Sequence, residues 1–176
     1  MVDIDGVISL FGPFSRAPGA PWEPAADGRE ALAGCFHSIE GIPHFLSSTA
    51  AAHLLDLAGL FDIVWASGWE EKAGEHLPRL LGLPAELPFL RFPRQARSTR
   101  TANAHWKLEA IDAFAGPRPL AWVDDSMNDA CRQWAGGRPA PTLLVQTAPE
   151  RGLTGQEAAA LSEWALSLIQ QGWTPA

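Results

Sequence analysis

Two aspartates stand two residues apart near the start of the chain, in the run Asp3-Ile4-Asp5-Gly6. Side chains at positions i and i+2 of an extended strand point to the same side. The two carboxylates can therefore converge where Gly6 lets the backbone leave the strand, and together they could act on one metal-bound phosphate. A solvated acidic turn is the alternative for this motif alone. A calcium loop is excluded because it needs its glycine at the sixth position.

The elements that must position these carboxylates are predicted as strands alternating with helices. Strands are expected at residues 36–39, 44–46, 62–66, 87–92, 120–123 and 142–145. Helices are expected at residues 48–57, 69–81, 105–114, 126–134 and 154–171. Such alternation is typical of an α/β fold with a parallel sheet covered on both faces, which binds ligands at the carboxyl ends of its strands.

The region after the acidic pair, residues 12–46, begins with a long irregular stretch. Its first half is rich in proline, glycine and alanine without any period, which predicts a long loop or flap. We interpret the region as a flap or loop insertion within a single domain, residues 1–176. Only Met1 and Val2 precede Asp3, so the first strand is unusually short or the natural start lies upstream.

Composition predicts one soluble globular domain, because 47% of the 176 residues are hydrophobic. No run reaches the roughly 20 apolar residues of a membrane span, and the acidic start is unlike a targeting peptide. We therefore expect a cytoplasmic protein without membrane attachment, and no stable protein partner is indicated. The net charge of −7 argues against a broad nucleic-acid-binding face. The two cysteines lack CxxC spacing and predict neither a zinc site nor a disulfide framework.

Polar side chains follow the carboxyl ends of the expected strands and should gather at one edge of a parallel sheet. They are Asp3, Asp5, Ser67, Asp124 and Asp125. Lys107 lies on the helix expected at residues 105–114, and it is the only lysine besides Lys72, so it is a natural countercharge. Taken singly, each of these residues could be a helix cap, a turn residue or a solvated position.

The order of these motifs resembles that of the haloacid dehalogenase (HAD) superfamily of phosphohydrolases. The run Asp3-Ile4-Asp5-Gly6 matches the first motif, Ser67 the second, Lys107 the third and the run Asp124-Asp125-Ser126-Met127-Asn128-Asp129 the fourth. A narrower group, the HAD-like domain associated with RNA-repair proteins, is similar in residues 64–70, 120–125 and 152–154. The resemblance implies a three-layer α/β/α Rossmann-like fold with a flap after the first strand and no large cap domain.

The resemblance also implies a catalytic role for Asp3, Asp5, Ser67 and Lys107, and substrate binding for Ser67 and Gly68. Asp3 would be the nucleophile that forms an aspartyl-phosphate, and Asp5 would protonate the leaving oxygen and then activate water. Ser67 and the Gly68 amide would bind the phosphoryl oxygens, while Lys107 would stabilise the nucleophile and the transferring group. The implied reaction is phosphomonoester hydrolysis, with a nucleotide or an RNA or DNA end among the expected phosphorylated substrates.

A magnesium ion belongs to the same implied site. Asp3, the main-chain carbonyl of Asp5 and Asp124 would hold Mg²⁺, and Asp125 or Asp129 would complete its shell. The sequence between these motifs has no room for a large cap domain. In this superfamily, the absence of such a cap is associated with open sites that suit bulky phosphates.

Four arginines precede Lys107, at positions 91, 94, 97 and 100. Arg94 and Arg97 are candidates to hold further phosphates or a nucleic-acid backbone, and a solvated charged loop is the alternative. The competing function is a catalytically silent HAD-like module that binds phosphate or a partner, although Asp3 and Asp5 speak against it. Dehalogenation is disfavoured because it needs no metal carboxylates, and Ser67 lacks the surroundings of a serine hydrolase nucleophile.

Overall fold

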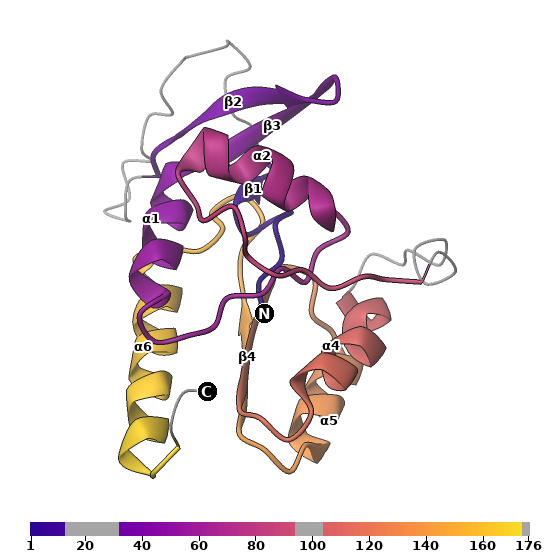
Figure 1. Ribbon diagram of the computed structural model, residues 1–176, viewed down its shortest axis with the longest axis vertical. Helices are drawn as coiled ribbons and strands as arrows, with labels where there is room; N and C mark the ends of the chain where they lie inside the picture. Colours follow the sequence, from indigo (N-terminus) through magenta and orange to yellow (C-terminus); the bar gives the residue numbers. More distant parts are fainter. Residues whose placement is uncertain (13–31, 94–103, 174–176) are drawn as a thin grey trace.

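The computed structural model describes residues 1–12, 32–93 and 104–173 as an α/β structure (Figure 1). Its strands are β1 (Ser9–Leu10), β2 (Gly34–Ile39), β3 (Ile42–Ser47), β4 (Leu120–Asp124) and β5 (Thr142–Gln146). Its helices are α1 (Ser48–Leu57), α2 (Glu71–Leu81), α4 (Leu108–Ala115), α5 (Asp129–Gly137) and α6 (Gly155–Gln170), with a short 3-10 helix, η1 (Ala104–Lys107). No helix in these ranges is long and apolar enough to cross a membrane.

A parallel sheet lies at the centre of the fold. Strand β4 pairs in parallel with β5, and Val2 forms parallel bridges to Val123 of β4 on one side and to Trp65 on the other. Trp65 in turn forms a parallel bridge to Phe89. The α/β class and the parallel sheet are therefore confirmed. The segments expected as strands at 62–66 and 87–92 are extended but pair with the sheet through one residue each, Trp65 and Phe89.

Hydrophobic side chains from this sheet enter two separate cores. Trp65 and Val123 join the core that contains residues of α1, α2 and α6. Ala66 and Trp122, their neighbours in sequence, join the core with residues of α4 and α5. Successive side chains of a strand point to opposite faces of its sheet, and Figure 1 shows α1 and α6 on one side of β4 and α4 and α5 on the other. Both faces of the sheet are thus covered, as the alternation of strands and helices predicts.

A second sheet is antiparallel and follows the acidic pair. Strands β2 and β3 form a hairpin, and β1 pairs with β3 on its other side. The hairpin turns at Glu40 and Gly41, which both have positive φ, as a two-residue turn of this type requires. The sequence placed Ile42 and Pro43 in the turn, but both lie on β3. The expected flap falls largely on residues 13–31, which lie outside the described residues.

Side-chain caps shift some of the helix starts that the sequence predicts. Ser47 caps α1, one residue before the expected Ser48. Asn128 caps α5, so this helix begins at Asp129 and not near Ser126. Thr154 caps α6 with a capping box, in agreement with the expected start. The shift at α5 matters for function, because it separates Asp129 from the end of β4.

Candidate active site

Lys107 joins two carboxylates inside the protein. Its Nζ lies 2.6 Å from Oδ2 of Asp3 and 2.7 Å from Oδ2 of Asp124. The three residues are 3%, 6% and 0% exposed, respectively. Burial lowers the pKa of Lys107, but Asp3 and Asp124 act against it and leave this pKa above its usual value. Lys107 is therefore a permanently charged ammonium between two buried carboxylates.

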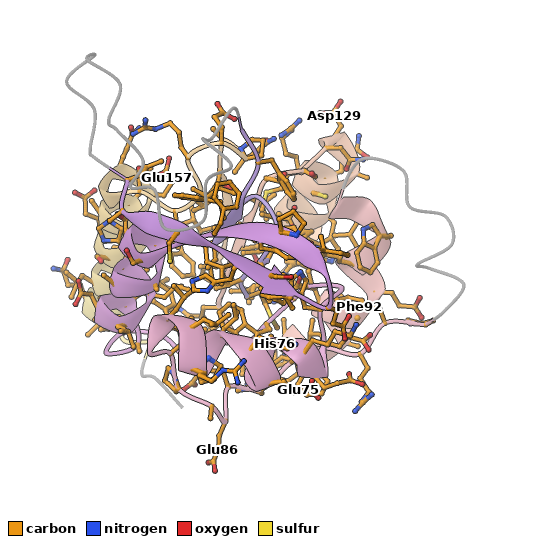
Figure 2. All side chains as sticks on the ribbon, turned by 90° about the horizontal axis from the view of Figure 1, so that it is seen from above. Glu75, His76, Glu86, Phe92, Asp129 and Glu157 are labelled. Atoms are coloured by element: carbon orange, nitrogen blue, oxygen red, sulfur yellow. The ribbon has the colours of Figure 1, made fainter. Side chains whose placement is uncertain are left out.

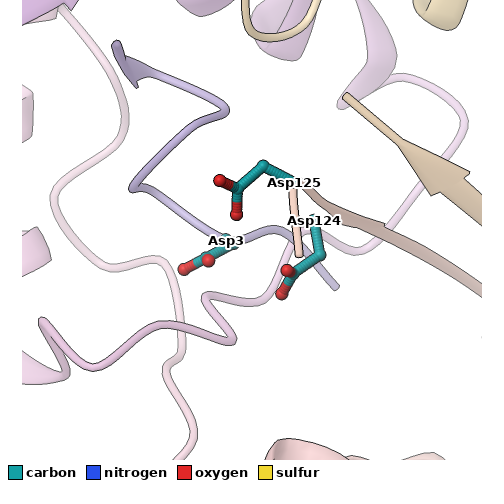
Figure 3. A group of neighbouring side chains, drawn as sticks. All are labelled: Asp3, Asp124 and Asp125. Atoms are coloured by element: carbon teal, nitrogen blue, oxygen red, sulfur yellow. The ribbon is translucent and has the colours of Figure 1, made fainter. Parts of the chain in front are cut away.

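Three carboxylates lie together at the carboxyl ends of the extended segment at Val2 and of β4. Single oxygens of Asp3, Asp124 and Asp125 lie within 4.8 Å of one another, and Figure 3 shows the three side chains close together. Carboxylate oxygens are the ligands that Mg²⁺ prefers, so this donor set fits the expected ion. The Asp129 side chain is 87% exposed and pairs with Arg132 on α5. The geometry therefore favours Asp125 over Asp129 for this group.

Gly6 makes room for one of these carboxylates. Its φ is +71°, and a Cβ added there would lie 2.4 Å from Cγ of Asp125. The Gly6 carbonyl accepts a hydrogen bond from Oγ1 of Thr147 at 2.8 Å, and Oγ of Ser126 donates to Oδ1 of Asp125 at 2.9 Å. Glycine is therefore required here both for its backbone conformation and for the close approach of Asp125.

Asp5 lies beside the three carboxylates but faces a different partner. The indole Nε1 of Trp69 lies 3.2 Å from each Asp5 carboxylate oxygen and donates to them. Burial raises the pKa of Asp5 to about 6, and the charge of Asp3 adds to this rise, whereas Trp69 and Lys107 act against it. A carboxyl group that titrates near neutral pH can both donate and accept a proton under physiological conditions.

Ser67 follows the strand segment next to Asp3. The Ala66 amide donates to the carbonyl of Val2 at 2.8 Å, so Ser67 and Asp3 come one residue after a bonded pair on neighbouring strands. Ser67 is 1% exposed and lies in a turn that leads into α2. The parallel sheet thus carries Ser67 and Asp3 to the same edge, as the sequence predicts.

The match to a protein family covers most of the chain. A family model described as the HAD domain in Swiss Army Knife RNA repair proteins matches residues 1–158 of the 176 residues. The chain belongs to this family. The resemblance inferred from the four motifs is confirmed, and membership of the HAD superfamily points to a phosphohydrolase-type activity. No curated protein and no solved structure matches the chain significantly.

The HAD domain brings together some of the residues named from its sequence and not others. Asp3, Asp124 and Lys107 are in direct contact. Arg94 and Arg97 lie outside the described residues. Arg91 is 71% exposed, lies 3.7 Å from a Glu71 oxygen, and stacks on a phenylalanine ring of the sheet edge.

Two features of the HAD domain site were missed from the sequence. One is the contact of Gly6 with Asp125, which the Gly in the first motif could have suggested because it follows the acidic pair directly. The other is the bond from Trp69 to Asp5. Its signal was the position of Trp69 directly after Ser67 and Gly68.

Replacing Gly6 with Ala is expected to weaken Mg²⁺ binding at least tenfold, because the added methyl group displaces the Asp125 carboxylate. Isothermal titration with Mg²⁺ measures this change. Gly41→Ala is the matched control, since Gly41 has φ +81° but nothing within 4 Å of an added Cβ. Both variants should lose about 1 kcal/mol of stability through backbone strain, but only Gly6→Ala should lose affinity. Equal Mg²⁺ affinity in the two variants would contradict the assignment.

Replacing Asp5 with Asn is expected to stabilise the metal-free HAD domain at pH 7.5. The folded state raises the pKa of Asp5 from 3.8 to about 6, so it holds this proton more tightly than the unfolded chain does. Stability therefore falls as pH rises from about 4 to about 6, by about 2 to 3 kcal/mol in all. Asn cannot ionise, so Asp5→Asn should raise the free energy of unfolding above pH 6 and change it little at pH 4.

Urea unfolding in a chelator at pH 4.5 and pH 7.5 measures this difference. Asp56→Asn, on the exposed side of α1, controls for the loss of one negative charge and should leave the pH dependence unchanged. If the free energy of unfolding changes with pH equally in Asp5→Asn and in the unmodified protein, Asp5 is not the source of the pH dependence.

Proposed function

We propose that this HAD domain is a Mg²⁺-dependent phosphomonoesterase that works through an aspartyl-phosphate intermediate. The observation that supports it best is the contact of Lys107 with Asp3 and Asp124, which fixes a carboxylate nucleophile beside a charged ammonium. Asp5 stands next to this pair with a pKa of about 6. The proposal is supported by the close approach of three groups that could serve as nucleophile, countercharge and titratable acid.

The proposed reaction has two steps. In the first, an Asp3 oxygen attacks phosphorus, the ester P–O bond breaks and Asp5 gives its proton to the leaving oxygen. In the second, Asp5 takes a proton from a water molecule, whose oxygen attacks the aspartyl-phosphate and releases phosphate and free Asp3. Lys107 keeps its proton throughout and lowers the repulsion between the Asp3 carboxylate and the phosphate anion.

Asp3, Asp124 and Asp125 would hold the Mg²⁺ ion together with the main-chain carbonyl of Asp5. The fit rests on the three converging carboxylates. Burial raises the pKa of Asp124 and of Asp125, which indicates that an added positive charge would stabilise this group. When bound, a divalent cation neutralises phosphate charge that would otherwise repel the nucleophile.

Phosphate oxygens would be held by Ser67 and the Gly68 amide, at the turn before α2. Arg94 and Arg97 remain proposed contacts to further phosphates or to a nucleic-acid backbone. The substrate class that we propose is a phosphorylated nucleotide or an RNA or DNA end. The family description supports this class, because it names RNA repair proteins.

The proposed architecture is the three-layer α/β/α Rossmann-like HAD fold in a single domain, with a flap in residues 12–46 and no large cap. The two cores on opposite faces of the sheet support the layers. Among described residues between Asp5 and Ser67, the hairpin and α1 are the main elements. An open site of this kind would suit a macromolecular phosphate.

Hydrolysis of p-nitrophenyl phosphate with and without Mg²⁺ tests the proposal. We expect turnover that requires the metal and stops on chelation, followed by release of phosphate from nucleotides and from RNA or DNA ends. A folded protein that binds Mg²⁺ and phosphate but hydrolyses none of these esters would instead be the catalytically silent module.

A further inference from the structure

Trp69 makes an unusual contact with the acid of the proposed site. The residue comes directly after Ser67 and Gly68, in the turn before α2, and its Nε1 lies 3.2 Å from both oxygens of Asp5. The two residues are 64 positions apart in sequence. The contact therefore joins the phosphate-binding turn to the acidic motif.

The Trp69 ring is itself held by the β2–β3 hairpin. The His44 ring on β3 packs edge-on against it, with centroids 4.9 Å apart at 72°. His44 Nδ1 lies 2.9 Å from Oγ of Ser9 on β1. Trp69 is partly buried and packs against the larger core, and Figure 2 shows the hairpin crossing the molecule with α2 beside it. These contacts fix the direction in which the indole N–H points.

The chemistry of an indole limits how Asp5 can carry a proton. The indole N–H can donate a hydrogen bond but has no lone pair to accept one. Because the indole nitrogen lies 3.2 Å from both Asp5 oxygens, the proton of a protonated Asp5 must point away from the indole. The side of the Asp5 carboxyl group that faces away from Trp69 is left to the leaving group of the substrate.

We propose that Trp69 is a positioning residue, which holds the Asp5 carboxyl group so that its proton, directed away from the indole, reaches the leaving oxygen. The inference rests on the proposed phosphomonoesterase function and names a residue beyond the family's four motifs. Its consequence concerns the leaving group. An alkoxide leaves only with a proton, whereas p-nitrophenolate is a stable anion and needs little help.

Trp69→Phe tests this role, because it removes the N–H and keeps an aromatic ring against His44. We expect kcat for an alkyl ester, ribose 5-phosphate, to fall about 10- to 100-fold, as for a misplaced general acid. With p-nitrophenyl phosphate, kcat should fall less than about threefold. Trp164→Phe, on α6 and stacked on Phe61, is the matched control and should change neither value. An equal loss with both esters would overturn the proposal.

Nuclear magnetic resonance of the indole N–H groups gives a readout that does not depend on turnover. The Trp69 signal is identified by its absence in Trp69→Phe. In Asp5→Ala, this signal should move upfield and exchange faster with solvent, while the Trp164 signal stays in place. An unmoved Trp69 signal would overturn the proposal. If no phosphomonoester is hydrolysed by the unmodified protein, the proposed function fails and the catalytic role of Trp69 fails with it.

Discussion

Replacing Asp3 with Asn is expected to lower kcat for phosphate release on the order of 10⁴-fold or more while the protein stays folded. Asn has the same size but cannot form an acyl phosphate that water then hydrolyses. Its side-chain oxygen can still accept the Ile4 amide, which lies 2.8 Å from Oδ1 of Asp3. Lys107 keeps its bond of 2.7 Å to Asp124, so no buried charge loses its partner.

Steady-state kinetics with p-nitrophenyl phosphate at saturating Mg²⁺ measures this loss, and circular dichroism during heating confirms the fold. Asp129→Asn is the matched control, because Asp129 belongs to the fourth motif but its side chain is 87% exposed. It should keep kcat within about threefold, as is usual for exposed positions away from the site. A tenth of the original activity remaining in Asp3→Asn would rule out Asp3 as the nucleophile.

Replacing Lys107 with Met is expected to lower the free energy of unfolding by about 3 to 5 kcal/mol and to abolish turnover. The substitution keeps the length of the side chain but leaves Asp3 and Asp124 buried without their shared countercharge. The loss should shrink on acidification, since burial raises the pKa of Asp124 and protonation of this carboxylate removes an unpaired charge. Urea unfolding in a chelator at pH 7.5 and pH 4.5 measures both effects.

The chain offers a matched control, because Lys72 is its other lysine. Lys72 pairs with Glu40 at the surface, where its side chain is 47% exposed, and Lys72→Met should cost no more than about 1 kcal/mol. Adding Asp3→Asn to Lys107→Met should recover part of the lost stability, because it removes one of the two unpaired carboxylates. Equal losses in the two lysine variants would contradict the buried triad.

Local pattern was sufficient to predict the residues at the ends of strands. Asp124 ends a run of apolar residues that forms β4, as expected. Asp3 follows Val2, whose pairing with the sheet is sufficient to place Asp3 at the same edge. The choice between Asp125 and Asp129 was left open by sequence. It depends on the start of α5, which the Asn128 cap sets one turn later than the apolar pattern suggests.

Contacts between distant segments could not be predicted from local pattern. Trp69 and Asp5 meet only because Val2 pairs with Trp65 in the sheet, which places the turn after Trp65 beside the acidic motif. The need for glycine at position 6 likewise depends on Asp125, which another strand carries into place. The turn of the β2–β3 hairpin was misplaced because proline is usually a turn residue. Strand β1 pairs only with a later part of β3, at Phe45 and Leu46. Pro43 is therefore tolerated on β3, since β1 does not need the N–H that proline lacks.

The order of segments in the parallel sheet also governs when the site can exist during protein synthesis. Val2 lies between Trp65 and Val123, so the earliest strand of the chain is enclosed by two segments that the ribosome makes much later. Pairing between residues so distant in sequence slows folding. Until β4 emerges, Asp3 has neither Asp124 nor the neighbouring strand that orients it. A nascent chain should therefore assemble the proposed site only after β4 has been made.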